Sequence, residues 1–414
     1  MAEKRNVRLK VEDLTLIFGK RKKEALKLLD EGMSKEEILK KTKCTVGVNR
    51  ASFDVFEGEI FVIMGLSGSG KSTLIRCLNR LNEPTAGKVF FKDHNITRDS
   101  NKQLLMTRRT EMSMVFQKFG LLPHKTVMEN AAFGLEIRNE PKKEREEKAM
   151  KALETVGLKG YEEQYPAEMS GGMQQRIGLA RALANDTDVL LMDEAFSALD
   201  PLIKTDMQDE LLQIQNKLHK TIVFITHDLD EAIKIGDRIA IMKDGVVEQI
   251  GTAEEILTDP ASEYVKAFVE KVDRKTIITA ETLMFEKFTL VQINKDGPKG
   301  AIRKMRTAGV DILPVEGEDM KFLGYVRLTD MLKLQEKKEK SVKPALITDV
   351  PSIYKNYTVE EMLPLISGHW YPLAVVEEDN GKLIGLVTQT SLIIETTKYD
   401  DDEVSELNKQ AKEI

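Results

Sequence analysis

The feature that most constrains this chain is the segment Gly65-Leu66-Ser67-Gly68-Ser69-Gly70-Lys71-Ser72, which fits the pattern G-x-x-x-x-G-K-[ST] at every fixed position. The apolar run 60–64 before it predicts a buried strand, and the run 73–78 after it predicts the start of a helix. Glycines let backbone N–H groups close around phosphate oxygens, and the helix N-terminus adds a partial positive charge. The segment is therefore predicted to bind a nucleoside triphosphate, with Lys71 at the β- and γ-phosphates and the Ser72 hydroxyl on Mg²⁺. The alternative is a plain glycine turn before a helix, which the Lys-Ser pair disfavours.

Length and composition narrow the class of protein. The 414 residues leave room for two or three domains, and the formal net charge of −6 argues against general binding to nucleic acid. Two cysteines, Cys44 and Cys77, cannot form a disulfide framework and suit a reducing compartment. The first ten residues lack the apolar core of a secretory signal, and no apolar run approaches the ~18 residues of a membrane helix. If the chain serves a membrane process, we expect another polypeptide to span the bilayer.

The order of apolar segments predicts the fold class. From Arg8 to about Gly251 strands alternate with amphipathic helices, which indicates an α/β fold with a largely parallel sheet. We expect strands at residues 59–64, 112–116, 189–192, 222–226 and 238–243. Residues 21–43 interrupt this alternation, and a capping box that begins at Ser34 predicts that a short helical insertion lies there, with a structural role.

A weak internal repeat occupies the C-terminal third. Residues 312–332 and 371–393 each read as a proline-containing strand, a turn, a strand with a leading glycine, and a helix. The spacing from Pro314 to Pro372 is 58 residues, and from Gly324 to Gly385 it is 61. The last fifteen residues, 400–414, begin with Asp-Asp-Asp-Glu and predict a solvated helix or an acidic tail.

Polar residues follow three of the predicted strands. Asp193 and Glu194 end the run 189–192; beside a phosphate loop, Asp193 is expected to hold Mg²⁺ and Glu194 to orient and deprotonate the attacking water. His227 follows the strand at 222–226 and can contact the γ-phosphate and Glu194, and Gln117 can touch the metal or the water. Each has an ordinary alternative: two acids at a strand end, a structural histidine, and a glutamine that carries little information alone.

A second glycine-containing segment decides between classes of nucleotide-binding protein. Ser170-Gly171-Gly172 lies in Met169–Arg176, and its hydroxyl and N–H groups at a helix start can form a second phosphate site. Together with Ser197-Ala198-Leu199-Asp200, this segment resembles the signature and dimer loops of ATP-binding-cassette (ABC) ATPases, although Met169 and Met173 stand in variable places. The resemblance implies that ATP is bound between the phosphate loop of one chain, including Thr73, and residues 170–172 and Asp200 of a second chain. Phe18 occupies the place of the adenine-stacking aromatic; its alternative is a core residue.

The wider pattern is similar to one subfamily. The phosphate loop, residues 191–202, the insertion at 21–43 and the C-terminal repeat resemble the ATPase subunit of osmoregulatory glycine betaine/proline importers (OpuA/ProV type), which carries a tandem cystathionine-β-synthase (CBS) module. The resemblance implies a P-loop ABC-type α/β domain at 1–271, a tandem CBS (α+β) pair at 272–399 and an acidic tail at 400–414.

The same resemblance implies a function. The chain is expected to be a homodimeric, peripheral ATPase on the cytoplasmic face of the plasma membrane. With ATP and Mg²⁺ it would drive two integral-membrane permease subunits, either free or fused to a substrate-binding domain, that import glycine betaine. The alternatives are the same motor for choline, carnitine or proline, and a soluble ABC ATPase acting on ribosomes or DNA. The soluble class usually has two cassettes or a coiled-coil insertion, and this chain shows neither.

The CBS repeat departs from the usual nucleotide pattern Gly-h-h-Ser/Thr-x-x-Asp. The first copy keeps Asp330 but has Arg327 in the Ser/Thr place, and the second keeps Thr388 but has Ser391 for the Asp. Ordinary AMP or ATP binding is therefore not indicated, and the resemblance leaves cyclic di-AMP inhibition and ionic-strength sensing open. The basic cluster nearest the repeat can hold anionic lipid or can be a solvated linker, and it comprises Lys333, Lys337, Lys338, Lys340 and Lys343.

Overall fold

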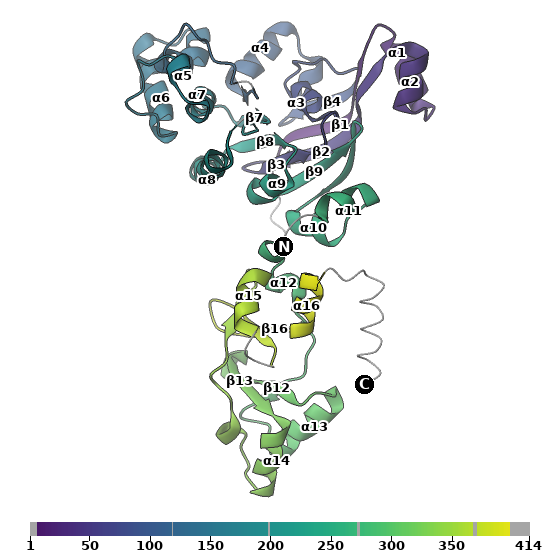
Figure 1. Ribbon diagram of the computed structural model, residues 1–414, viewed down its shortest axis with the longest axis vertical. Coiled ribbons are helices and arrows are strands. Elements are labelled where there is room, and N and C mark those ends of the chain that lie inside the picture. Colours follow the sequence, from purple (N-terminus) through teal and green to yellow (C-terminus); the bar gives the residue numbers. More distant parts are fainter. Residues whose placement is uncertain (1–5, 118, 198, 271–273, 367–370, 398–414) are drawn as a thin grey trace. The chain divides into compact units, whose positions relative to one another are not determined.

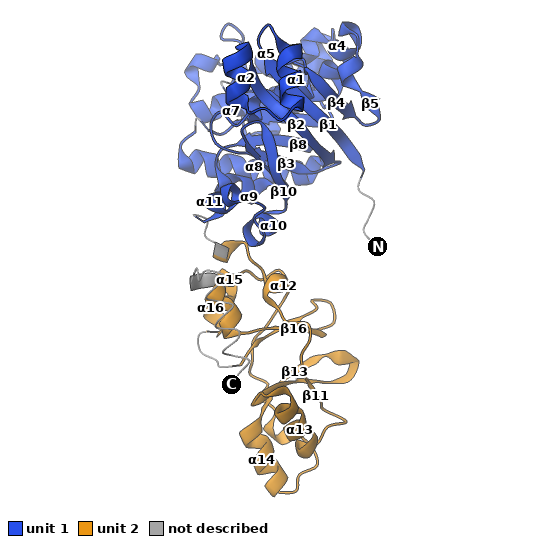
Figure 2. Cartoon of the chain, turned by 90° about the vertical axis from the view of Figure 1, so that its right-hand side faces the viewer, with its two compact units in different colours: residues 1–272 blue, residues 273–414 orange. Residues whose placement is uncertain are grey.

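The computed structural model describes residues 6–117, 119–197, 199–270, 274–366 and 371–397, and it divides the chain into two compact units, residues 1–272 and 273–414 (Figure 2). Ala198 and the predicted tail at 400–414 lie outside the described residues. No described helix is long and apolar enough to cross a membrane. Unit 1 holds all the residues with a predicted catalytic role.

Two sheets form the centre of unit 1 (Figure 1). The larger has the order β10-β9-β3-β8-β7-β6, in which all pairs are parallel except β9 with β10. Its strands are β3 (Ile60–Met64), β6 (Met112–Val115), β7 (Val189–Asp193), β8 (Thr221–Thr226), β9 (Arg238–Lys243) and β10 (Val246–Gly251). The smaller sheet is antiparallel, with the order β2-β1-β4-β5, and consists of β1 (Val7–Phe18), β2 (Thr45–Phe56), β4 (Ala86–Phe91) and β5 (His94–Asn95). The five predicted strands match strands of the larger sheet; the smaller sheet and β10 were not predicted.

One apolar core joins these sheets to α3 (Lys71–Leu78). The strands β3, β7 and β8 are buried along their whole length, as expected for parallel strands covered on both faces. Phe53 of β2 stacks on Phe61 of β3 with ring centroids 5.1 Å apart, so the two sheets pack directly on each other. The core therefore fixes the strand ends from which the polar residues project.

The remaining helices of unit 1 lie around this core. Three of them, α5 (Val127–Ile137), α6 (Lys142–Thr155) and α7 (Gly171–Ala184), pack on one another beside β6 as a helical lobe (Figure 1). The others are α4 (Asn101–Thr110), α8 (Pro201–Leu218), α9 (Leu229–Ile235), α10 (Ala253–Thr258) and α11 (Glu263–Val269). Short 3-10 turns occur at 96–98 and 166–168.

The predicted insertion consists of α1 (Lys22–Asp30) and α2 (Lys35–Thr42). The capping box at the start of α2 is present: the Ser34 side chain accepts from the backbone N–H of Glu37, and the Glu37 carboxylate accepts from the N–H of Ser34. A separate small core holds the two helices against the ends of β1 and β2, and it includes Ile17, Leu29 and Ile38. The insertion thus packs on the strand that ends at Phe18.

Unit 2 contains two copies of one arrangement. In each, a short strand pairs in parallel with a second strand, which pairs antiparallel with a third. The copies are β11 (Val291–Gln292), β12 (Ile312–Glu316) and β13 (Phe322–Arg327), followed by β14 (Ser352–Ile353), β15 (Leu373–Val376) and β16 (Leu383–Val387). The helices are α12 (Ala280–Leu283), α13 (Pro298–Ala308), α14 (Leu328–Glu336), α15 (Val359–Ile366) and α16 (Gln389–Thr397), with 3-10 turns at 274–276, 318–320 and 343–345.

The two copies share a third apolar cluster at their interface. Tyr325 of β13 is fully buried, stacks on Tyr371 with centroids 5.4 Å apart, and donates a hydrogen bond of 2.8 Å to the backbone carbonyl of Pro372. The segment before the first copy also pairs with the second, because Phe285 forms a backbone bridge with Leu386. The repeat predicted from sequence is therefore one intertwined body rather than two independent modules.

Candidate nucleotide site

The phosphate loop connects β3 to α3, and neighbouring backbone carbonyls leave no room for side chains at two of its glycines. Gly65 and Gly70 both have positive φ, at +152° and +103°. A Cβ added at Gly65 would collide with the carbonyl oxygen of Met242, and one added at Gly70 would collide with that of Gly47. Only glycine tolerates both the positive φ and the missing space for a Cβ. The loop therefore packs closely on the neighbouring backbone, with its N–H groups at the start of α3.

Lys71, the first residue of α3, is only 4% exposed. Its Nζ donates to the carbonyl oxygens of Gly65 at 2.8 Å and Leu66 at 3.1 Å. Burial lowers the pKa of Lys71, while the carboxylates of Glu194 and Asp193 act in the opposite direction. The ammonium group is therefore held over the loop, on the side where phosphates are expected.

The remaining residues of the loop line the same turn. Leu66 is exposed, and the Ser69 hydroxyl is buried without a hydrogen-bond partner. Ser67 and Gly68 are exposed at its tip, while Ser72 and Thr73 are half-buried in the first turn of α3. An unpartnered buried hydroxyl beside the N-terminus of α3 fits a phosphate ligand.

Asp193 ends β7 and is 1% exposed. One carboxylate oxygen pairs with Arg76 of α3 at 3.1 Å, and the other, Oδ1, is buried without a partner. A buried carboxylate oxygen of this kind suits Mg²⁺, which usually takes one or two carboxylates and completes its shell with phosphates and water. The described residues contain no cluster of three or more His, Cys, Asp or Glu that could hold a metal alone.

Glu194 is the point where four parts of the chain meet. Its carboxylate accepts a 2.8 Å hydrogen bond from the Gln117 side chain, and it lies 3.8 Å from Lys71 Nζ and 3.9 Å from His227 Nδ1. Glu194 also has φ of +47°, a conformation that costs energy for a residue with a side chain and is common at functional sites. The structure therefore brings Gln117, Glu194, His227 and Lys71 together.

A network of charged and polar side chains holds the loop that carries His227. Lys204 of α8 pairs with Asp228 at 2.5 Å and with Glu231 at 3.6 Å. Asp228 also caps α9 by accepting from the N–H of Glu231, and Gln208 donates to the Glu231 carboxylate. This network joins α8, which begins beside Asp200, to the strand end at His227, and sequence reasoning missed it.

Phe18 lies at the end of β1 with 43% of its surface exposed, so it is not a core residue. A Cβ added at Gly47 would contact both the Phe18 ring and the Thr73 methyl group, which shows that the three residues are adjacent. The aromatic ring is thus presented to solvent beside the first turn of α3.

Residues 170–172 lie at the start of α7, in the helical lobe apart from α3 (Figure 1). Ser170 caps α7 by accepting from the N–H of Met173, and Ser170 and Gly171 are exposed. Asp200 caps α8 in the same way, by accepting from the N–H of Ile203 at 3.1 Å. These residues are therefore outside the cluster around Glu194 within a single chain, and they offer N–H groups to solvent.

A turn that sequence reasoning missed completes the site. The chain reverses between β9 and β10 at Asp244 and Gly245, whose positive φ values of +51° and +85° are those of a type I′ turn. The N–H of Gly245 donates to the carbonyl of Ser69 at 2.8 Å. The Asp-Gly dipeptide is the signal that would have identified this hairpin.

Comparison with known proteins supports this geometry. The family described as "ABC transporter" matches residues 48–197, and "CBS domain" matches residues 342–396. The glycine betaine/carnitine transport ATP-binding protein GbuA of Listeria monocytogenes is 52% identical over 93% of this chain and 96% of its own length. The chain belongs to the family of ABC transporter ATP-binding subunits.

Two further relatives agree. The glycine betaine transport ATP-binding protein OpuAA of Bacillus subtilis is 50% identical over 94% of this chain and 93% of its own length. A solved dimeric bacterial ABC transporter cassette, MJ0796, is 30% identical over 59% of this chain and 98% of its own, with a TM-score of 0.50. The predicted family and fold class are thus confirmed.

Membership also confirms the predicted enzyme class, because such subunits bind ATP and hydrolyse it to drive transport. They work as dimers with permease partners in the membrane. The roles of the individual site residues stay predictions.

We expect Glu194→Gln to lower the ATPase rate of the dimer by about 10²–10⁴-fold, because the amide cannot accept the proton of the attacking water. ATP affinity should change little, since the side chain is isosteric and is not required to hold phosphates. Steady-state hydrolysis and equilibrium binding of ATP measure the two effects. Glu144→Gln on the exposed face of α6 is the matched control, and near-normal turnover in Glu194→Gln would contradict the assignment.

Proposed function

We propose that the chain is the ATP-hydrolysing subunit of an osmoregulatory importer whose solute is glycine betaine. The observation that carries the proposal is the 50–52% identity, over 93–94% of this chain, to relatives named for glycine betaine transport. A choline transport ATP-binding protein of Bacillus subtilis, OpuBA, is 36% identical over 84% of this chain. The higher identity favours glycine betaine over choline.

In the proposed mechanism the nucleotide is held by the phosphate loop, with Lys71 at its β- and γ-phosphates and Phe18 against the adenine. Ser72, Asp193 and Gln117 would hold Mg²⁺, which neutralises phosphate charge and orients the γ-phosphate. Glu194 takes the proton of the attacking water, while His227 and Gln117 sense whether the γ-phosphate is present. The contacts of Glu194 with Gln117, His227 and Lys71 support these roles.

We infer that each ATP is shared between two chains. Ser170 and Gly171 offer a helix N-terminus to solvent, and they lie on a different lobe from Lys71. Residues 170–172 and Asp200 of one subunit would therefore complete the phosphate site of the other. The similarity to a cassette whose structure is dimeric supports this arrangement.

A shared site predicts a particular pattern in mutant dimers. When both chains carry Ser170→Arg, both composite sites are damaged, and ATPase activity should fall at least about tenfold, because a bulky cation replaces the helix cap at the second phosphate site. When one chain carries Lys71→Ala and the other Ser170→Arg, a single site holds both lesions and the other is intact. ATPase assays on purified tagged heterodimers measure this difference. Wild-type activity in the double Ser170→Arg dimer would contradict the shared site.

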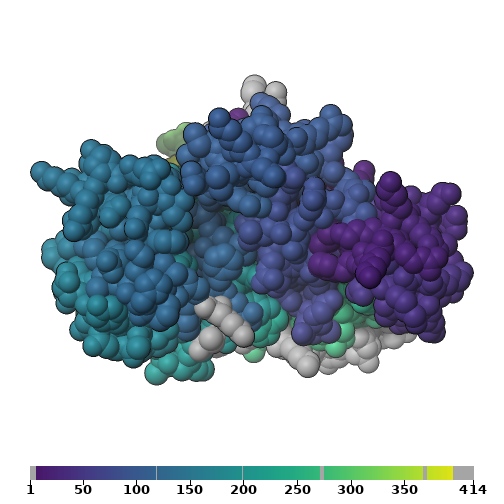
Figure 3. Space-filling view, turned by 90° about the horizontal axis from the view of Figure 1, so that it is seen from above, coloured from purple at the N-terminus to yellow at the C-terminus, as the bar shows by residue number. Residues whose placement is uncertain are grey.

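The permease partner would dock in a groove of about 360 Å³ between the helical lobe and the β6 side of unit 1. Figure 3 looks onto this side, where the surface between the two parts is hollowed. The groove is lined by exposed apolar side chains, Leu81 and Phe116, and by the guanidinium groups of Arg108 and Arg181. An apolar groove with cationic edges suits a short helix of a membrane protein, which would place the subunit on the cytoplasmic face of the plasma membrane.

Reconstitution tests the solute. The chain, assembled with its two permease subunits and a glycine betaine-binding domain in proteoliposomes loaded with MgATP, should accumulate labelled glycine betaine. An excess of unlabelled proline or choline should reduce uptake less than the same excess of glycine betaine. The complex with Glu194→Gln is the control and should not accumulate solute. Stronger competition by choline, carnitine or proline would assign a different cargo.

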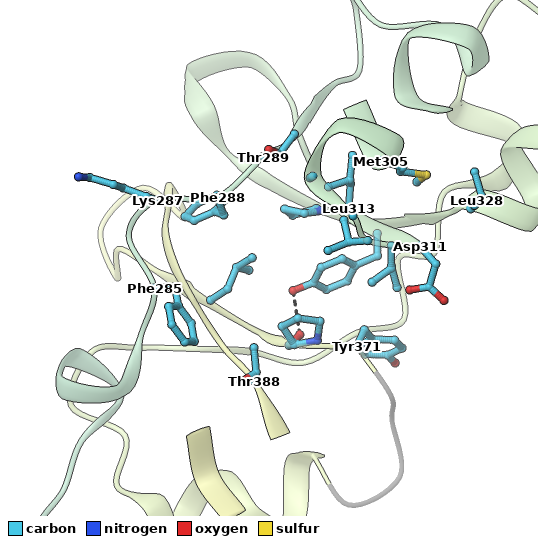
Figure 4. A pocket seen from close by; sticks show the side chains of 18 of the residues that line it. Phe285, Lys287, Phe288, Thr289, Met305, Asp311, Leu313, Leu328, Tyr371 and Thr388 are labelled. Carbon is cyan, nitrogen blue, oxygen red and sulfur yellow. Dashed lines mark hydrogen bonds between the residues drawn. The ribbon is translucent and has the colours of Figure 1, made fainter. Parts of the chain in front are cut away.

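We further propose that unit 2 regulates the motor by binding cyclic di-AMP. A cavity of about 1410 Å³ lies between the two copies, larger than the ~300–1,000 Å³ typical of single small ligands. Figure 4 shows the aromatic side chains of Phe285, Phe288 and Tyr371 around it, with Lys287 and Thr388 at its edge. Aromatic faces suit purines, and Lys287 with Arg306 suits phosphates. Asp330, the acid that the first copy keeps from the usual CBS nucleotide pattern, forms an ion pair with Lys333.

Anionic lipid is the second ligand class proposed for unit 2. The five lysines between 333 and 343 are all exposed, on α14 and the segment that follows it. Exposed lysines attract lipid headgroups at low salt, and ionic screening weakens this attraction over about 10 Å at 0.1 M. Transport should then rise with ionic strength when the vesicles contain anionic lipid.

Binding of cyclic di-AMP to the full-length chain should weaken by roughly tenfold or more in Arg306→Ala, the loss expected for one charge-assisted hydrogen bond to phosphate. Isothermal titration calorimetry measures the dissociation constant. Lys299→Ala, an exposed cation on the same helix and not part of the cavity lining, is the matched control and should bind as the wild type does. Equal affinity in Arg306→Ala, or no binding by the wild type, would refute the site.

A further inference from the structure

The end of β9 and the turn that follows it support the phosphate loop at two points. At one end of the loop, Gly65 lies so close to the carbonyl oxygen of Met242 that no Cβ would fit between them. At the other end, the carbonyl of Ser69 accepts the 2.8 Å hydrogen bond from Gly245. A displacement of this turn would therefore move the loop backbone that faces the nucleotide.

Tyr264 of α11 contacts the end of β9, against which the phosphate loop packs. Its hydroxyl donates to the carbonyl of Met242 at 3.4 Å, and its ring lies 4.7 Å from Lys243 Nζ in a cation–π contact. Burial raises the pKa of Tyr264. The Met242 carbonyl that accepts from Tyr264 is packed against Gly65, and the carbonyl of Gly65 accepts from Lys71 Nζ at 2.8 Å. Contacts therefore run from α11 through Met242 and Gly65 to the ammonium group of Lys71.

Charged residues and a second aromatic ring lie near Tyr264. Asp244 of the turn lies 3.9 Å from Lys35 of the insertion, and Asp244 and Glu248 both act to raise the pKa of Tyr264. Phe268, one turn further along α11, packs edge-on against the Tyr264 ring with centroids 5.0 Å apart. The ring is therefore oriented by its own helix as well as by the turn.

α11 leads from unit 1 into unit 2, so the contacts of Tyr264 lie next to the connection between the units. It is the last helix of unit 1 and ends at Val269, four residues before unit 2 begins at Asp273. Val265 and Val269 are buried, and α11 packs on α10 of the same unit. A force applied to the connection by unit 2 acts on the same helix that carries Tyr264.

We propose that Tyr264 is a positioning residue that couples the connection to unit 2 with the phosphate loop, so that ATP binding and the state of unit 2 influence each other. When ATP draws Lys71 toward its phosphates, the hydrogen bond from Lys71 to Gly65 is released, and the packing of Gly65 against the Met242 carbonyl that binds Tyr264 is altered. Linkage makes the effect reciprocal: a change at α11 alters ATP affinity by the same factor. The inference concerns ATP binding alone and does not depend on the transported solute or on a ligand for unit 2.

Hydrogen–deuterium exchange of the full-length chain tests the coupling. With AMP-PNP and Mg²⁺, wild-type peptides that cover 65–78, 263–269 and 274–283 should each change their exchange rate, the last two by about fivefold or more, the lower end of typical allosteric coupling. In Tyr264→Phe, which removes only the hydroxyl, the change at 65–78 should persist while those at 263–269 and 274–283 fall below about twofold. Tyr161→Phe, an exposed tyrosine of the same unit, is the matched control and should respond as the wild type does.

Steady-state kinetics supplies a second readout. Tyr264→Phe should raise the KM for ATP by about 3–10-fold with kcat within twofold, because the phenol acts on the loop and not on the reacting atoms. Three results would overturn the proposal: no nucleotide response at 263–283 in the wild type, an undiminished response in Tyr264→Phe, or a fall in kcat at constant KM. Loss of the response at 65–78 together with a lower melting temperature would show that Tyr264 only packs, and would also overturn it.

Discussion

The parallel register of β3, β8 and β7 is the constraint on which the rest of unit 1 depends. Met64 pairs with Thr226, and Ile225 pairs with Asp193, so the phosphate loop, His227 and Glu194 all begin at one edge of the sheet. Because these strands are buried on both faces, a slip of one residue would place charged groups in the core. The same packing that stabilises the domain therefore aligns the residues that act on the nucleotide.

Much of this could be predicted from the sequence, for identifiable reasons. Continuous apolar runs marked the central strands, and the fixed spacing of the phosphate loop located Lys71 and Ser72. The antiparallel sheet was missed because β1 and β2 pair across the 21–43 insertion and carry irregular registers. Contacts made by side chains from distant segments leave no local pattern, since they depend on how separate elements pack. Examples are the contacts of Arg76 with Asp193, of Lys204 with Asp228, and of Tyr264 with Met242 of β9.

The two units use polar groups differently. In unit 1 half-buried and buried charges are paired across elements: Lys204 of α8 pairs with Asp228 and Glu231, which joins two segments that flank the site. In unit 2 the interface between the copies is mainly aromatic and aliphatic, and Tyr325 contributes one hydrogen bond to Pro372. Directional ion pairs hold strand ends in one geometry, whereas an apolar interface around an open cavity tolerates small shifts. This contrast suits a rigid reaction centre in unit 1 and a more adaptable unit 2.

The hydrogen bonds of Lys71 to Gly65 and Leu66 have a consequence for the catalytic cycle. With these carbonyls as partners, the buried ammonium group is not left unpaired. If Lys71 binds the β- and γ-phosphates as predicted, the nucleotide must compete with those two carbonyls, and part of its binding energy is offset. The affinity of the loop for a phosphate therefore reflects the difference between two sets of acceptors for one lysine, and not the full strength of either set.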